Sequence, residues 1–182
     1  MATAAPRTIQ LIGSMFAAQA CSCACDPCVC GDHCTCKGAD AYLGPRWRFV
    51  GDYVQAGSAY GVDVTQSILL NLAQTSDENS DAWHEFILID EQTTPDQANA
   101  LLTAFQRQGS EVAHVHRLPT VDRPVYLVPM HYTITEERNI LSVVFSPDRS
   151  QLIEGDASIP FFQEWSYNGH VAIQQPLEQW NG

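Results

Sequence analysis

The chain has 182 residues and an apolar fraction of 45%, which is enough to bury a sizeable core. Twenty-one acidic and nine basic residues give a formal net charge of −12. A field of that sign repels phosphate backbones and anionic lipids, so we expect neither nucleic acid nor a membrane surface as a partner. These values predict a single domain spanning residues 1–182.

The first predicted element is a strand from Thr8 to Gln19. Its end, Ala18-Gln19-Ala20 before Cys21, is similar to the cleavage site of a secretory signal. Four polar or glycine positions interrupt the apolar run, however, and no run in the chain reaches the length of a membrane span. We therefore expect this segment to be a strand and the protein to be cytoplasmic.

All seven cysteines follow within 16 residues, in the stretch CSCACDPCVCGDHCTC. Side chains two residues apart in an extended segment project to the same side and can share an ion, and thiolates select soft metals. The expected ions are Cu(I) or Zn(II). A multinuclear cluster is compatible with the number of thiolates, because four complete one tetrahedral zinc site and three remain. The predicted ligands are Cys21, Cys23, Cys25, Cys28, Cys30, Cys34 and Cys36, with His33 either a further ligand or a solvated loop residue.

Three other interpretations of the cysteines stay open. A disulfide framework leaves one of seven thiols over, although a longer-range bridge such as Cys23 to Cys30 is compatible with the spacing. Reduced cysteines packed as small apolar residues fit one or two positions better than seven. The spacing of Cys25 and Cys28 is that of a thiol–disulfide redox pair, but no strand–helix–strand pattern surrounds it.

Alternating patterns predict a strand at 47–55, in which Gly51 marks a bulge or a close approach, and a further strand at 62–72. Gly57 and Gly61 are expected to bracket the turn between them. A fourth strand is expected at 83–90, after an acidic loop.

Thr94-Pro95-Asp96-Gln97 is a capping box and predicts a helix over 95–108 that ends at Gly109. The apolar residues of this helix recur at helical spacing and form one stripe: Ala98, Leu101, Leu102 and Phe105. A single amphipathic helix needs a sheet to lie on.

The rest of the chain is predicted to be mainly strand, at 111–118, 124–135, 139–145, 151–154 and 170–174, with a turn at 146–149. The fold class is therefore α+β and mainly β: an antiparallel curved sheet or sandwich with one amphipathic helix and an N-terminal cysteine-rich loop. Within the single domain we expect a metal-binding lobe at 21–36 and a β-rich body at 46–174.

No second constellation of reactive residues emerges from the remaining histidines. His114 and His116 share one face of a predicted strand but lack a third ligand. His131 and His170 are expected to pack in the core or at its rim, and the position of His84 indicates no role. The acidic pairs at 90–91 and 136–137 are interpreted as solvated strand ends. Nucleotide-binding and serine-hydrolase motifs are absent from the sequence, so an enzyme is not the favoured class.

Several short motifs resemble a bacterial family of unknown function whose members open with a strand, a Cys-Asn-Cys and a Cys-Pro-Cys. The matching residues here are Cys21-Ser22-Cys23, Cys28-Val29-Cys30, WRFVGDY at 47–53, Val62-Asp63-Val64, Ile89-Asp90-Glu91, the helix TPDQANALLTAF and the closing WSYNGH. Val29 departs from the family's proline, and Cys25, Cys34 and Cys36 enrich the tract. This resemblance implies a fold more than a function. The cysteine tract by itself is similar to bacterial metallothioneins.

The function expected from the sequence is soft-metal binding for storage, buffering or delivery. Its partners would be metal ions and a metal-receiving protein, and exposed strand edges permit a homo-oligomer. The alternatives are a redox protein using Cys25 and Cys28, and a structural or interaction domain stapled by a metal or disulfides.

Overall fold

The computed structural model of the chain describes residues 8–19, 47–75, 83–106, 123–134, 139–155, 165–170 and 173–177. Within these ranges there are eleven strands, one α-helix and one 3₁₀ turn. In chain order they are β1 (Ile9–Gln19), β2 (Trp47–Ala59), β3 (Val62–Asp63), β4 (Ser67–Thr75), β5 (Trp83–Asp90), α1 (Pro95–Gln106), β6 (Val125–Val128), β7 (Met130–Ile134), β8 (Asn139–Phe145), η2 (Pro147–Arg149), β9 (Gln151–Glu154), β10 (Trp165–His170) and β11 (Ile173–Leu177).

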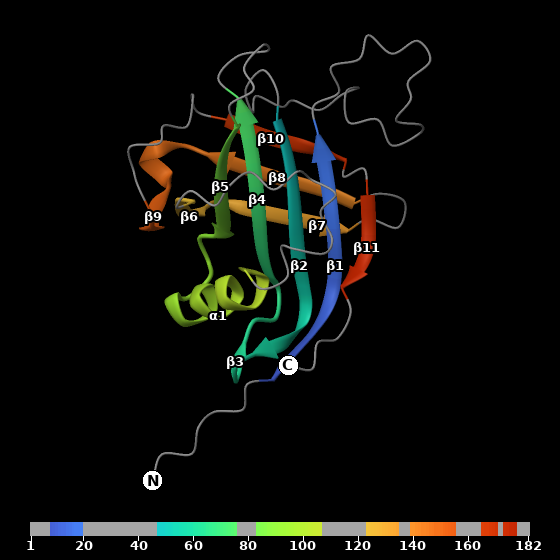
Figure 1. Cartoon of the computed structure of the whole chain (residues 1–182). Helices are drawn as coiled ribbons and strands as arrows, with labels where there is room; N and C mark the ends of the chain where they lie inside the picture. The colour runs from blue at the N-terminus through green and yellow to red at the C-terminus, as the bar shows by residue number, and fades with distance from the viewer. Residues whose placement is uncertain are drawn as a thin grey trace.

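The strands form two sheets. The larger has eight strands in the order β11-β1-β2-β4-β5-β6-β9, with β3 paired to β2, and the smaller has the order β10-β8-β7. Neighbouring strands are antiparallel except β5 and β6, which are parallel because α1 lies between them in the chain. Figure 1 shows the small sheet crossing one face of the large sheet, while α1 lies against the other. The predicted class, α+β and mainly β, is confirmed.

The central strands are apolar on both faces because each face has a covering layer. In β4, Leu70 and Leu72 point toward the small sheet, while Leu69 points toward α1. The same alternation in β5 sends Leu88 to the small sheet and Ile89 to the helix side. A strand covered on both faces reads as a continuous apolar run, as these two do.

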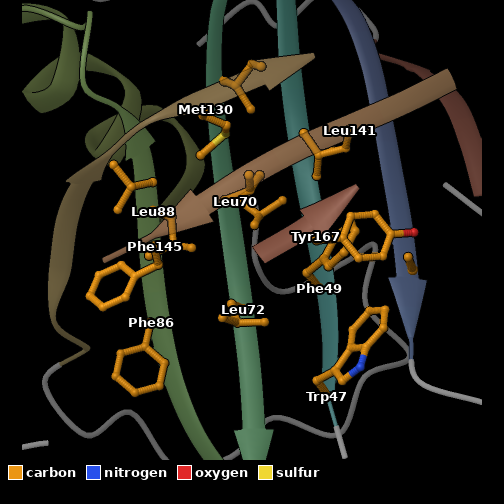
Figure 2. Close-up of a cluster of buried hydrophobic side chains, with 14 of the residues drawn as sticks. Trp47, Phe49, Leu70, Leu72, Phe86, Leu88, Met130, Leu141, Phe145 and Tyr167 are labelled. Carbon is orange, nitrogen blue, oxygen red and sulfur yellow. The ribbon is translucent and has the colours of Figure 1, made fainter. Parts of the chain in front are cut away.

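Aromatic side chains dominate the layer between the sheets (Figure 2). The Trp47 and Phe49 rings stack with centroids 5.7 Å apart, and Tyr167 meets Phe49 edge-on at 5.0 Å. Phe16 of β1 stacks on Tyr132 of β7 at 4.9 Å. Offset and edge-on pairs of this kind add to the gain from area burial alone.

The capping box is confirmed at the start of α1. The Gln97 amide nitrogen donates to Thr94 Oγ1 at 3.3 Å, and the Thr94 amide donates to Gln97 Oε1 at 3.0 Å. The predicted stripe is also confirmed, because Ala98, Leu101, Leu102 and Phe105 are all buried against the large sheet. The described helix ends at Gln106, and the predicted C-cap Gly109 lies outside the described residues.

Two predicted strands are in fact each divided. The stretch 124–135 is β6 in the large sheet and β7 in the small one, and the chain changes sheet at Pro129, which lacks the N–H a ladder needs. The stretch 62–72 breaks between β3 and β4, where Asp63 Oδ1 accepts the Thr65 amide at 2.9 Å and Gln66 has a φ of 60°.

Gly51 is a point of close approach, as predicted: a Cβ there would lie 2.5 Å from Phe16 Cζ. The bulge lies elsewhere, at Gln55, because Ile12 pairs with Ala56 while Gly13 pairs with Val54. The turn expected between Gly57 and Gly61 starts later, since β2 continues through Gly57 to Ala59.

The other strands differ from expectation at the end of the chain. Strands at 83–90, 139–145 and 151–154 are confirmed, and the turn at 146–149 contains the 3₁₀ turn η2. The terminal strand expected at 170–174 is instead β11, Ile173–Leu177, after a separate strand β10. The strand expected at 111–118 lies outside the described residues.

Candidate metal site

The predicted cysteine site connects two adjacent strands. The described residues stop at Gln19, the last residue of β1, and resume at Trp47, the first residue of β2. Gln19 is the register partner of Arg48, so both ends of the intervening segment 20–46 are held side by side at one end of the large sheet (Figure 1). All seven predicted cysteine ligands and His33 belong to this segment and lie outside the described residues.

A charged row lies on the helix-side face of the sheet at this same end. Register places Arg48, Ala73 and Glu85 side by side on β2, β4 and β5. The Glu85 carboxylate forms an ion pair with Arg123, whose Nε lies 2.7 Å from Glu85 Oε2. Burial lowers the pKa of Arg48, and attraction to Glu85 opposes that shift. Two guanidinium groups therefore flank one carboxylate, which makes this row suited to ion pairing and not to holding a cation.

The opposite face at this end is aromatic and amide-rich. Trp47, Gln74 and His84 form the corresponding row on β2, β4 and β5. Gln74 exposes only 1% of its surface, and its Nε2 has no hydrogen-bond partner within the described part of the chain. His84 is half-buried and engaged in an interaction.

The other histidines are spread over the molecule. His131 is exposed on β7, where its Nε2 lies 2.7 Å from Thr133 Oγ1, so of the two predicted places, core or rim, the core is excluded. His170 ends β10 opposite Ile140, and His114 and His116 lie outside the described residues. Among the residues that the structure describes, no three side chains of His, Cys, Asp or Glu come together in a way that could hold a metal ion.

The two acidic residues at the end of β5, Asp90 and Glu91, differ in exposure. Glu91 is exposed, as expected of a solvated strand end, whereas Asp90 is half-buried. Asp90 Oδ1 accepts the Gln92 amide at 2.9 Å. Burial raises the pKa of Asp90, and this hydrogen bond opposes the shift. The Asp90 side chain thus stabilises the turn that leads toward α1. The second acidic pair, at 136–137, lies outside the described residues.

Sequence reasoning missed Asp52, a half-buried carboxyl group on the helix-side face between Met15 and Leu69. Burial raises its pKa to about 7. Alternation along the predicted strand 47–55 puts Asp52 on the face opposite Phe49, but only the presence of a second covering layer makes that face an interior one.

No helix in the described parts of the chain is both long and apolar enough to cross a membrane. Comparison with protein-family models, with curated proteins and with solved structures finds no match to this chain.

Proposed function

We propose that the segment Cys21–Cys36 binds soft metal ions, Cu(I) or Zn(II), through its seven thiolates, and that the protein stores, buffers or delivers them. The observation that carries the proposal is the concentration of every cysteine of the chain into 16 residues, at spacings of two to four residues. Thiolates so close together repel one another in a protein of net charge −12, and bound cations would offset that charge.

The described body supports this assignment because it is complete without sulfur ligands. Its two apolar layers are filled by aliphatic and aromatic side chains from β1 to α1 and from β6 to β10. None of the described residues in these layers is a cysteine, which is in keeping with another use for the thiols. The paired residues Gln19 and Arg48, at the adjacent ends of β1 and β2, give the segment a fixed base.

Closed thiolate coordination favours storage or transfer over catalysis, because four sulfurs around one zinc leave no position for substrate. Cu(I) in a cluster of bridging thiolates would suit the three sulfurs that remain. His33 is the one nitrogen ligand inside the tract. A metal-receiving protein would take the ion by thiolate exchange, since each ion is held by several replaceable sulfurs.

We also propose a cytoplasmic location, in which the thiols stay reduced. The segment 8–19, which is similar to a secretory signal, is the strand β1, paired with β2 on one side and β11 on the other. Cleavage after Ala20 would remove Leu11 and Phe16, which are fully buried, from both apolar layers. This placement supports retention of the segment.

The test is native mass spectrometry of the reduced protein after incubation with Zn(II) or Cu(I). Two or more ions per chain are expected, and a variant with all seven cysteines changed to serine should bind none. A single retained ion would indicate a structural staple, and no ion together with a fast-reacting thiol at Cys25 or Cys28 would indicate redox chemistry. Either of those two results would contradict the proposal.

Three single variants distinguish the residues that bind the metal from neighbouring residues of the tract. His33→Ala reports whether the histidine contributes, and Ser22→Ala changes a side chain of the tract without removing sulfur. Metal affinity should be unchanged in Ser22→Ala, measured by competition with a chromophoric chelator. Cys28→Ser should weaken binding at least tenfold. Equal affinities for Cys28→Ser and Ser22→Ala would show that the metal is held elsewhere.

A further inference from the structure

The small sheet covers only part of the face of the large sheet on which it lies. Its strands follow one another along β2 in the order β10, β8, β7 (Figure 1). The Tyr167 ring of β10 meets Phe49 edge-on at 5.0 Å, and the Tyr132 ring of β7 lies 4.9 Å from that of Tyr53. Two strand spacings thus correspond to the four residues from Phe49 to Tyr53. One further strand beside β7 would therefore lie over Ala56.

An open groove occupies the place of this further strand. It is lined by Gln10, Ile12, Ala56, Gly57, Ser58 and Thr65 and has a volume of about 280 Å³. Ile12 is the register partner of Ala56 and exposes 59% of its surface, the highest value of any large apolar side chain in the described ranges. The groove therefore has an apolar floor that the small sheet leaves uncovered.

The edge of β7 on the side of this groove presents backbone groups for pairing. Among the described strands β7 pairs only with β8. The Val144 amide donates to the Pro129 carbonyl at 3.2 Å, so Pro129 faces β8. Because successive residues of a strand turn their backbone groups to opposite sides, His131 also faces β8, whereas Met130 and Tyr132 face the other edge. Two amides and two carbonyls are therefore aligned to pair with an added strand.

A second copy of the chain cannot supply that strand through its own β7. Antiparallel pairing of two β7 strands around a two-fold axis places both large sheets on the same side of the joined small sheets. In each copy β1 and β2 extend past β7 as far as Ile9 and Ala59, which are register partners. These strand ends would collide with the large sheet of the other copy. A single extended segment with no sheet beneath it avoids the collision.

Acidic side chains flank the groove and the edge. Asp63 is exposed and is the register partner of Ser58, which lines the groove. Glu91 is also exposed, and its amide donates to the carbonyl of Val128, two residues before Met130. In a chain of net charge −12, these positions favour a ligand with basic residues at its ends.

We propose that the β7 edge and the groove bind an extended segment of a partner protein, which adds a fourth strand to the small sheet. Its backbone would pair with Met130 and Tyr132, and one of its apolar side chains would cover Ile12. Backbone pairing combined with contacts from alternate side chains is a general mode of peptide recognition at a sheet edge. The groove lies at the end of the large sheet remote from the cysteine segment, so this binding requires no metal.

The test uses a synthetic peptide, Lys-Thr-Val-Thr-Val-Thr-Lys with both ends blocked, and follows the full chain by NMR. At saturating peptide the Met130 and Tyr132 amides should exchange at least about tenfold more slowly, because they gain acceptors. The His131 and Thr133 amides, which face β8, are internal controls and should change little.

Two methylated forms of the peptide test the pairing itself. An antiparallel strand turns its valine amides toward β7, and a parallel strand turns its threonine amides there. N-methylation of one of these two sets should therefore abolish binding, while N-methylation of the other set should leave most of it.

A matched pair of variants tests the floor of the groove. Ile12→Ala should weaken binding of the peptide at least about threefold, because it removes apolar area that the peptide covers. Ile153→Ala is the control, since Ile153 is 39% exposed on β9, at the other edge of the large sheet, and its truncation should leave the affinity unchanged. Glu91→Gln should reduce the salt dependence of binding.

Three kinds of result would overturn the proposal. Unchanged exchange at Met130 and Tyr132 with millimolar peptide would show that the edge accepts no strand. Equal binding of both methylated peptides, or equal affinities for Ile12→Ala and Ile153→Ala, would place the contact elsewhere. Slow exchange of both amides before peptide is added would show that the edge is already occupied, by a second copy if the rate depends on protein concentration and otherwise by the same chain.

Discussion

The β-rich body and the cysteine segment divide the chain into a part specified by packing and a part specified by chemistry. The body fills two apolar layers, one on each face of the large sheet, with aliphatic and aromatic side chains of the described residues. The segment 20–46 holds every thiol and lies between β1 and β2 in the chain. We therefore expect stability and metal binding to respond to separate sets of substitutions.

The largest effect is expected from a cavity between the sheets. Phe49 exposes 2% of its surface and touches the rings of Phe16, Trp47 and Tyr167. Phe49→Ala should lower the free energy of unfolding by about 3–5 kcal/mol, measured by urea denaturation.

Ile12→Ala is the control for that variant, since Ile12 is 59% exposed and its truncation should cost well under about 1 kcal/mol. The number of metal ions bound by folded Phe49→Ala should equal that of the unchanged protein. Fewer bound metal ions in the folded variant would show that metal binding depends on the packing of the β-rich body.

The next effect concerns Asp52, whose pKa is raised to about 7 by burial. A group whose pKa is higher in the folded than in the unfolded state stabilises the fold at low pH. This contribution is lost as pH rises from about 4 to about 7. Asp52→Asn should therefore match the unchanged protein near pH 4 and exceed its stability by about 2–4 kcal/mol at pH 8.

Asn71→Ala is the control for the pH dependence, because Asn71 lies on the same face, is half-buried and cannot titrate. Its effect on stability should be the same at both pH values. A pH-independent difference for Asp52→Asn as well would mean that the carboxyl group is not buried in the folded protein.

A smaller effect is expected at the start of α1. Thr94→Ala removes the hydroxyl that accepts the Gln97 amide and should lower the free energy of unfolding by about 1 kcal/mol. Thr103→Ala, in the exposed middle of the helix, removes only a hydrogen bond to the Asn99 carbonyl and should have little effect or a slightly stabilising one. Equal losses in both variants would argue against a specific capping contribution.

The smallest effect on the body is expected from metal removal. A chelator should strip the ions from the segment and leave the far-ultraviolet circular dichroism and the unfolding midpoint of the β-rich body nearly unchanged. Cooperative unfolding of the whole chain on chelation would show that metal and body are a single unit.

Much of the fold could be predicted because its local signals are strong. The capping box at Thr94 and the apolar stripe of α1 marked one helix, and alternation marked β2, β5 and β8. The division at Pro129 could not be placed, since a proline in an apolar run is compatible with either an edge strand or a change of sheet. Asp52 was missed because its burial depends on which layers cover both faces of β2.

The site presents the opposite case, because the chemistry of its residues is evident and their arrangement is not. Cysteine spacing selects a class of ion without fixing how many ions are held or which sulfurs bridge. The charged row with Arg48 and Glu85, and the ion pair of Glu85 with Arg123, could not be foreseen. These residues come together only through the pairing of strands far apart in sequence.

X-ray absorption spectroscopy of the zinc-loaded protein tests most directly whether thiolate sulfur holds the metal. A first shell made of sulfur at about 2.3 Å, with at most one nitrogen at about 2.0 Å from His33, is the expected result. A shell of oxygen and nitrogen at about 2.0–2.2 Å without sulfur would contradict the claim.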